Sequence, residues 1–292
     1  MPNAKPLAQA RMNSAQPGAV AHRFPREAVF WRVNREMVSL LAGGRALLLQ
    51  VAHPRVAAGV AEHSHFKEDP LGRLRRTMNT MWSIVFDEPA AGRASLERIA
   101  GVHGKVRGVV GQNEASFAGA RYDAFDPELL LWVHATLIDS GMVAYHRFVE
   151  PLSPAEASQY YEQSKLLAQL FEIPEGIVPD SLADFQSYMK AMIAGNQISV
   201  GPAARALAQD ILYPPTWLLK PAGPLQRLIT AGLLPAEIRE AYALKWDEWR
   251  RRKFKLAART IRTLLPLIPR PLRVVPQARA AERRARKHGV LE

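Results

Sequence analysis

Residues 69–86 read Asp69-Pro70-Leu71-Gly72-Arg73-Leu74-Arg75-Arg76-Thr77-Met78-Asn79-Thr80-Met81-Trp82-Ser83-Ile84-Val85-Phe86. Asp69 can cap a helix, Pro70 suits the first turn of a helix, and no further proline occurs before Pro89. The stretch therefore predicts a helix of about four turns. Steps of three and four residues place one set of side chains on a single face of this helix, namely Arg73, Arg76, Thr77, Thr80 and Ile84.

This predicted helix combines a polar stripe with many large apolar side chains. The stripe holds arginine and threonine, whereas Met78, Met81, Trp82, Val85 and Phe86 add apolar surface. We expect such a helix to be buried, with a polar stripe that binds something. The structural alternative is a stripe whose polar groups are satisfied by neighbouring carboxylates. The helix alone does not separate these two interpretations.

The composition limits the chemistry that the chain can support. Its 292 residues are 48% hydrophobic, which suffices for one large core or two small ones. It has no cysteine, so disulfides, zinc–cysteine sites, iron–sulfur clusters and cysteine nucleophiles are excluded. The formal net charge of +12 favours attraction to anionic membranes or nucleic acid.

The order of composition along the chain predicts one domain between two tails. Residues 1–26 contain no acidic side chain and no secretory pattern, so we expect a disordered tail and a cytoplasmic protein. Residues 27–266 are expected to form the helical domain, and residues 267–292 a proline-rich, basic tail. No apolar run reaches the roughly 18 residues of a membrane-spanning helix.

Helical periodicity dominates the chain and strand signals are few, which predicts an all-α, multi-helix single domain. Residues 108–125 are rich in loop signals. Ser153-Pro154-Ala155-Glu156 is a capping box that starts a helix. The other predicted helices cover residues 24–41, 46–52, 55–62, 90–106, 126–148, 181–194, 203–212, 225–231 and 235–265, and a frayed helix covers 277–288.

Three of the eight histidines lie in apolar helical surroundings, namely His53, His103 and His134. For any one of them, a core histidine bonded to a backbone carbonyl is the simpler interpretation. The loop pair His63 and His65 is a weak metal signal. The sequence has no HExxH, GxGxxG, GxxxxGK[ST] or GxSxG motif, so zinc proteases, nucleotide cofactors and a serine-nucleophile elbow have no support.

Haem is one cofactor that these residues could hold. It needs a strong axial ligand, a wide apolar slot and cations for its two propionates. A single buried histidine would supply the ligand. Arg73 and Arg76 would supply the cations or a group on the distal side. The residues alone leave this as one hypothesis.

Several motifs resemble the catalytic domain shared by latex-clearing rubber oxygenases and MpaB-type oxygenases. They are Gly43-Gly44-Arg45-Ala46-Leu47-Leu48-Leu49-Gln50-Val51-Ala52-His53-Pro54, Arg73-x-x-Arg76-Thr77, Val102-His103-Gly104-x-Val106-x-Gly108 and Leu131-Trp132-Val133-His134-Ala135-Thr136-Leu137-Ile138-Asp139-Ser140. The match covers roughly residues 31–188. The resemblance implies an all-α, partly globin-like fold that holds haem b. It also implies dioxygen chemistry on isoprenoid or other alkene substrates.

The resemblance also implies roles for individual residues. His103 looks like the proximal haem ligand, and Arg73 and Thr77 look like the Arg and Thr of the R-x-x-K-T element of the rubber oxygenases. Arg76 stands where those enzymes carry a lysine that can bind iron, and arginine is a poor metal ligand because it stays protonated. His134 and His53 are further cofactor-binding candidates that would pack beside the site.

Two other functions remain as alternatives. The first is a non-catalytic basic helical module, whose residues 250–253 and 279–287 would bind anionic lipid or nucleic acid. The second is a hydrolase or isomerase that uses histidine and Asp139 without iron. For the oxygenase, we expect a small apolar substrate and dioxygen, weak membrane contact through the basic C-terminal segment, and no specific nucleic-acid partner.

Overall fold

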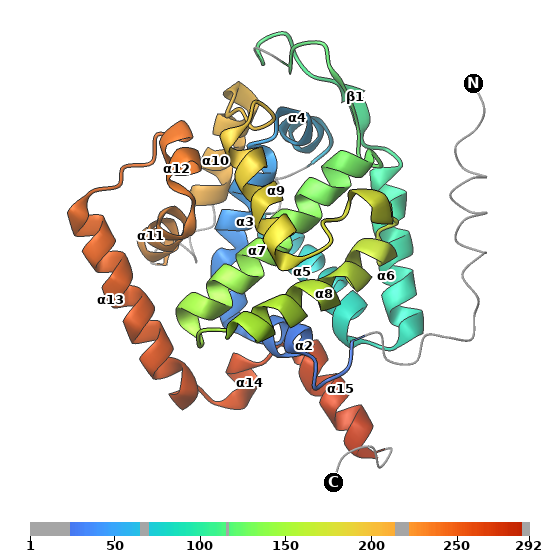
Figure 1. The fold of residues 1–292 in the computed structure, drawn as a ribbon, viewed down its shortest axis with the longest axis vertical. Coiled ribbons are helices and arrows are strands. Elements are labelled where there is room, and N and C mark those ends of the chain that lie inside the picture. Colours follow the sequence, from blue (N-terminus) through green and yellow to red (C-terminus); the bar gives the residue numbers. More distant parts are fainter. Residues whose placement is uncertain (1–23, 65–69, 115–116, 214–221, 288–292) are drawn as a thin grey trace.

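The computed structural model describes residues 24–64, 70–114, 117–213 and 222–287. Helices form almost all of the regular structure in these ranges, which confirms the predicted all-α single domain (Figure 1). A globin-like core remains a prediction. No helix in the described ranges is both long and apolar enough to cross a bilayer.

Two helices of very different length cross in the middle of the fold (Figure 1), namely α3 (Gly43–Val51) and α7 (Pro127–Phe148). Trp132 of α7 donates its indole N–H to the carbonyl oxygen of Leu49 at 3.1 Å. The hydroxyl of Tyr242 donates to the neighbouring carbonyl oxygen of Leu48 at 2.8 Å. These bonds fix α3 between α7 and the C-terminal third of the domain.

Around this centre pack α2 (Val29–Asn34), the 3-10 helix η1 (Met37–Ala42), α4 (Pro54–His63), α8 (Pro154–Leu170), η3 (Glu175–Ile177), α9 (Leu182–Ala194), α10 (Pro202–Leu212) and α11 (Gly223–Leu233). The predicted capping box of α8 is confirmed, because Ser153 and Glu156 bond to each other's backbone N–H. The single helix predicted over residues 24–41 is wrong, since α2 and η1 divide it.

The segment predicted as loop-rich contains a small antiparallel hairpin. Strand β1 (Arg107–Val109) pairs with β2 (Arg121–Asp123), and Gly108 lies opposite Tyr122. A Cβ atom on Gly108 would lie 2.4 Å from the Tyr122 hydroxyl oxygen, so only glycine leaves room for this buried tyrosine. The glycine that suggested a loop is therefore the residue that lets the strands pair.

The long helix predicted over residues 235–265 is also wrong. It is divided into α12 (Ala236–Ala241) and α13 (Glu248–Leu264). Ala243 has a φ of 53°, which lies in the left-handed region and ends the first helix. Asp247 then caps the second helix by accepting from the Arg250 N–H at 2.8 Å.

The C-terminal segment differs from the expected tail without apolar residues to bury. After η5 (Leu265–Leu267) it forms α14 (Arg270–Arg273) and α15 (Pro276–Lys287). Five of its small apolar side chains are buried, namely Val274, Val275, Ala278, Ala281 and Ala285. The alanines recur at three- and four-residue steps, so they form a narrow stripe that large residues alone do not reveal. Of the predicted N-terminal tail, residues 1–23 lie outside the described part.

Candidate functional site

The predicted central helix forms an antiparallel hairpin with its successor, as α5 (Pro70–Phe86) and α6 (Pro89–His103) are joined by two residues. Near the turn, a Cβ atom on Gly92 would lie 3.6 Å from the Ser83 carbonyl oxygen, so the two backbones approach closely there. The arms have 17 and 15 residues, so their far ends lie level. This register brings Arg73 and His103, the two main predicted residues, to the same end of the hairpin.

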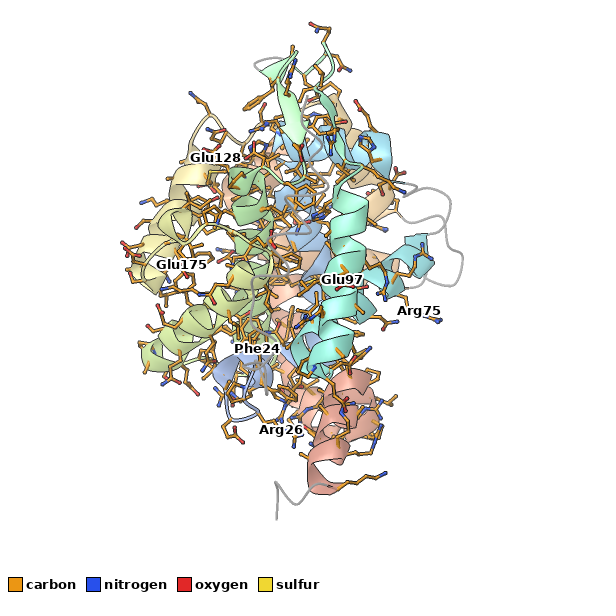
Figure 2. All side chains as sticks on the ribbon, turned by 90° about the vertical axis from the view of Figure 1, so that its right-hand side faces the viewer. Phe24, Arg26, Arg75, Glu97, Glu128 and Glu175 are labelled. Carbon is orange, nitrogen blue, oxygen red and sulfur yellow. The ribbon has the colours of Figure 1, made fainter. Side chains whose placement is uncertain are left out.

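Several described side chains in the N-terminal half of α5 are exposed to solvent. Arg76 and Thr77 are exposed, and Arg75 projects outward (Figure 2). Arg73 lies in the first turns of α5, and its side chain is outside the described part. The expectation of a buried helix is therefore right only for the last turn, where Ile84, Val85 and Phe86 are buried. Thr80 bonds to the Arg76 carbonyl oxygen at 2.8 Å instead of to a carboxylate.

His103 ends α6 and is partly buried. Its ring lies edge-on to that of Phe125, with 6.0 Å between ring centroids. Burial lowers the pKa of His103, and the nearby Asp123 carboxylate opposes this by a smaller amount. The imidazole is therefore neutral at physiological pH, the form that binds a metal. Within the described residues, neither ring nitrogen has a hydrogen-bond partner.

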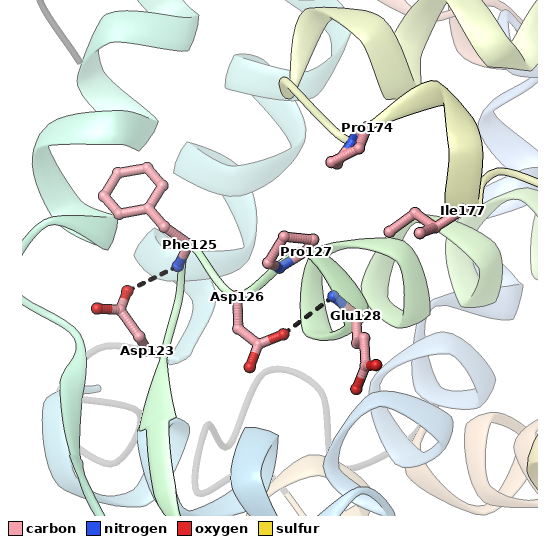
Figure 3. A pocket seen from close by; sticks show the side chains of 7 residues that line it. All are labelled: Asp123, Phe125, Asp126, Pro127, Glu128, Pro174 and Ile177. Atoms are coloured by element: carbon pink, nitrogen blue, oxygen red, sulfur yellow. Dashed lines mark hydrogen bonds between the residues drawn. The ribbon is translucent and has the colours of Figure 1, made fainter. Parts of the chain in front are cut away.

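A surface hollow of about 680 Å³ lies beside Phe125 (Figure 3). Its lining residues are Asp123, Phe125, Asp126, Pro127, Glu128, Pro174 and Ile177. Asp123 accepts from the Phe125 N–H at 2.8 Å, and Asp126 caps α7 by accepting from the Glu128 N–H at 3.0 Å. Asp126 also pairs with Arg55. The sequence predicted the helix start at Asp126, but not that Phe125 of this turn would contact His103.

His134 is the most unusual polar residue of the core. It is 5% exposed, and neither ring nitrogen has a hydrogen-bond partner in the described part of the chain. Burial alone lowers its pKa to about 4, so the ring is neutral. The other buried polar groups on α7 are satisfied, as Trp132 bonds to α3 and Thr136 bonds to the Val133 carbonyl oxygen. A buried imidazole without partners requires a functional or structural explanation.

His53 has a local structural role. It caps the N-terminus of α4, where its Nδ1 accepts from the Arg55 N–H at 3.3 Å. Burial and the charge of Arg55 lower its pKa to about 4. Of the weak loop pair, His63 bonds to the Tyr122 hydroxyl at 3.2 Å, and His65 lies outside the described residues. Across those residues, no three His, Asp or Glu side chains gather as a metal site.

Arg45 forms a buried polar centre that sequence reasoning did not anticipate. It donates to the Leu233 carbonyl oxygen at 2.8 Å, to the Ser140 hydroxyl at 2.6 Å and to the Asp139 carboxylate. The signal available in the sequence was an arginine within the apolar run of α3, since a buried cation needs partners. Asp139 is held in this ion pair, and within the described residues no histidine bonds to it, so the hydrolase or isomerase alternative gains no support.

Comparison with known proteins gives one family match. Residues 31–263 match the family described as ER-bound oxygenase mpaB/B'/Rubber oxygenase, catalytic domain. The chain belongs to this family. The match confirms the predicted resemblance and extends it beyond residue 188.

Two relatives come from mycobacteria, namely the uncharacterized proteins Mb2261 of Mycobacterium bovis and Rv2237 of Mycobacterium tuberculosis. Each is 31% identical to the chain over 232 residues, which cover 76% of this chain and 87% of the relative. No solved structure gives a significant match. The family supports an oxygenase role, and the relatives' names add no substrate.

Proposed function

We propose that this protein is a haem b-dependent oxygenase that acts with dioxygen on an apolar small molecule, isoprenoid-like or another alkene. The observation that carries the proposal is the neutral His103 at the same end of the α5–α6 hairpin as the Arg73-x-x-Arg76-Thr77 element, in a chain of the oxygenase family. Bound haem would supply the dioxygen chemistry, and the protein would supply position and polarity. A cytoplasmic location is part of the same proposal.

The donor groups of the chain fit such a cofactor. His103 would hold the iron through one nitrogen, because burial keeps its ring unprotonated. Arg73 and Arg76 would border the cofactor, one at a propionate and one toward the side that dioxygen reaches. Thr77 would offer a hydroxyl hydrogen bond there. Arg76 would leave the iron without the lysine ligand of the rubber oxygenases.

His134 would also contact the bound cofactor. Its two unpartnered nitrogens are buried in the core, and a group bound beside α7 would give at least one of them a partner. This role explains why a helix that satisfies its other buried polar groups keeps one imidazole unsatisfied. His53 would act at a distance, by fixing the start of α4.

The absorbance spectrum of freshly purified protein tests the proposal. We expect a Soret band in the wild type and its loss in His103→Ala, with the helix content unchanged by circular dichroism. His146→Ala is the matched control, because His146 is exposed on α7. If His134→Ala loses haem while His103→Ala keeps it, the ligand assignment is wrong but the cofactor assignment stands. Wild-type protein that stays colourless and takes up no added haem would refute the proposal.

A further inference from the structure

One continuous segment of the chain exposes an unusual number of large apolar side chains. Residues 249–272, which we call the α13–α14 face, supply six of the twelve that are exposed among the described residues. These six are Trp249, Leu256, Leu264, Leu267, Ile268 and Leu272. The helix α13 forms one outer edge of the molecule, and α14 follows it (Figure 1). Large exposed apolar side chains that are concentrated on one outer element mark a candidate interaction site.

The inner and outer faces of α13 are clearly separated. Phe254 and Ala258 are buried against α7 and α11, in a small core with Ile229. Trp249 and Leu256 are seven residues apart and therefore share the opposite face, where they are 64% and 67% exposed. One side of the helix thus holds the fold together, and the other presents a tryptophan and a leucine to solvent.

The charged side chains of this segment are all basic, and Arg252, Lys253 and Arg259 lie within a quarter turn of the Trp249 and Leu256 direction on α13. Residues 249–272 contain eight basic and no acidic side chains, namely Arg250, Arg251, Arg252, Lys253, Lys255, Arg259, Arg262 and Arg270. The first three share Asp247 and Glu248 at the helix start, and Arg270 pairs with Glu282. Lys255, Arg259 and Arg262 have no carboxylate partner within the described residues. The ammonium of Lys253 lies 4.7 Å from the Trp249 ring centroid.

We propose that the α13–α14 face docks the protein on an anionic lipid bilayer, with α13 lying in the interface. Apolar side chains that point outward between cations suit insertion among acyl chains below a layer of anionic headgroups. A nucleic acid would use the cations but would leave the leucines exposed to water. A second copy of this chain would bring the same positive charge to the contact. This inference is independent of the proposed oxygenase activity.

Vesicle sedimentation of the full chain tests the proposal. With vesicles of phosphatidylcholine and phosphatidylglycerol in a 3:1 ratio, we expect most of the protein to sediment at about 0.1 M salt, and much less at about 1 M salt. With pure phosphatidylcholine we expect little sedimentation. Arg252→Gln with Arg259→Gln should weaken partitioning at least about tenfold, because each cation near the surface contributes about fivefold.

Two matched controls separate this face from general charge and apolarity. Arg93→Gln with Arg98→Gln removes two exposed cations from α6, and should leave binding within about twofold. Trp249→Ala with Leu256→Ala should abolish most binding, whereas Val109→Ala, at an exposed strand residue, should not. Equal binding to both vesicle types, or wild-type binding by the Trp249 and Leu256 variant, would overturn the proposal. So would binding only to a DNA duplex, or a dimer that forms without any vesicle binding.

Discussion

Arg273, near the end of the domain, pairs with Glu36, near its start, and its Nε lies 3.1 Å from Oε2 of that carboxylate. The Glu36 side chain is 3% exposed and also lies 3.6 Å from Nε of Arg35. Next to this ion pair, the Val275 N–H donates to the Arg35 carbonyl oxygen at 2.9 Å. The C-terminal segment is thus bonded to the start of the domain by charge, by backbone and by its buried alanine stripe.

Deletion of residues 267–292 should therefore lower the stability of the protein. It exposes the surface that Val274, Val275 and the alanine stripe cover, and it leaves the buried Glu36 with a weaker partner. We expect a loss of at least about 3 kcal/mol, or a fall in melting temperature of roughly 10 °C. Arg283→Gln, at an exposed residue of α15, is the control. An unchanged melting temperature would mean that the segment is dispensable, as a tail would be.

Asp139→Asn should destabilise the fold by about 2 kcal/mol, as measured by urea unfolding. The substitution keeps the side-chain shape but removes the charge that faces Arg45, whose guanidinium side chain is only 5% exposed. In one of its two orientations, the asparagine side chain also points its NH2 group toward the N–H donors of Arg45. Asp180→Asn, on an exposed loop, should change stability by less than about 0.5 kcal/mol. Similar losses in both variants would contradict a special role for the Arg45 centre.

His134 should make the protein sensitive to acid. The folded state holds its pKa at about 4, so between pH 6.5 and 4 the unfolded chain binds more protons than the folded protein. The contribution of the neutral His134 ring to the free energy of unfolding is complete above pH 6.5 and is lost as the pH falls through 4. The total loss is about 3 kcal/mol. We expect urea unfolding of His134→Leu to show a smaller loss of stability between pH 7 and 4. Part of the acid-induced loss of stability remains in that variant, because the pKa of His53 in the folded state is also about 4.

His134→Leu should in addition stabilise the cofactor-free protein at pH 7, because it removes a buried polar group without partners. The same variant should bind haem more weakly than the wild type. His146→Leu, on the exposed side of α7, should do neither. A destabilised His134→Leu protein would indicate that the imidazole is already satisfied in the free protein.

Arg76→Lys should change the resting absorbance spectrum of the haem-loaded protein. Arg76 is exposed in the free protein, and a haem bound against it would remove water from this position. Lysine can lose its proton in such a desolvated site and bind iron, whereas arginine stays protonated. We expect a shift toward a six-coordinate, low-spin spectrum. Arg75→Lys is the matched control, because Arg75 is equally exposed but lies one residue earlier on the same helix and so points about 100° away from Arg76. The same spectrum in both variants and the wild type would place Arg76 away from the iron.

The sequence predicts the helices well where large apolar residues and caps mark them. The helix after Asp126 and the capping box at Ser153 lie within about one residue of their predicted starts. The break at Ala243 could not be predicted, because a left-handed backbone at alanine has no sequence signal of its own. The packing of α15 was missed for a different reason, as alanine buries little area per residue and periodicity is usually sought in larger side chains.

The candidate site was predictable only in part. The histidines were found from their apolar neighbours, and His134 is indeed buried. The ring contact between His103 and Phe125 joins residues from separate elements, which a one-dimensional pattern does not reveal. The exposure of Arg76 depends on which elements cover α5, and that is a property of the whole fold.

The level ends of the α5–α6 hairpin restrict how its length can change. One extra residue in a single arm would shift its far end by about 1.5 Å and rotate it by about 100° relative to the other arm. The backbone positions of Arg73 and His103 would then no longer lie level at one end of the hairpin. Insertions would preserve their alignment only if they came in both arms together, by whole turns. Both positions are therefore set by the number of residues that separate them from the two-residue turn at Asp87 and Glu88.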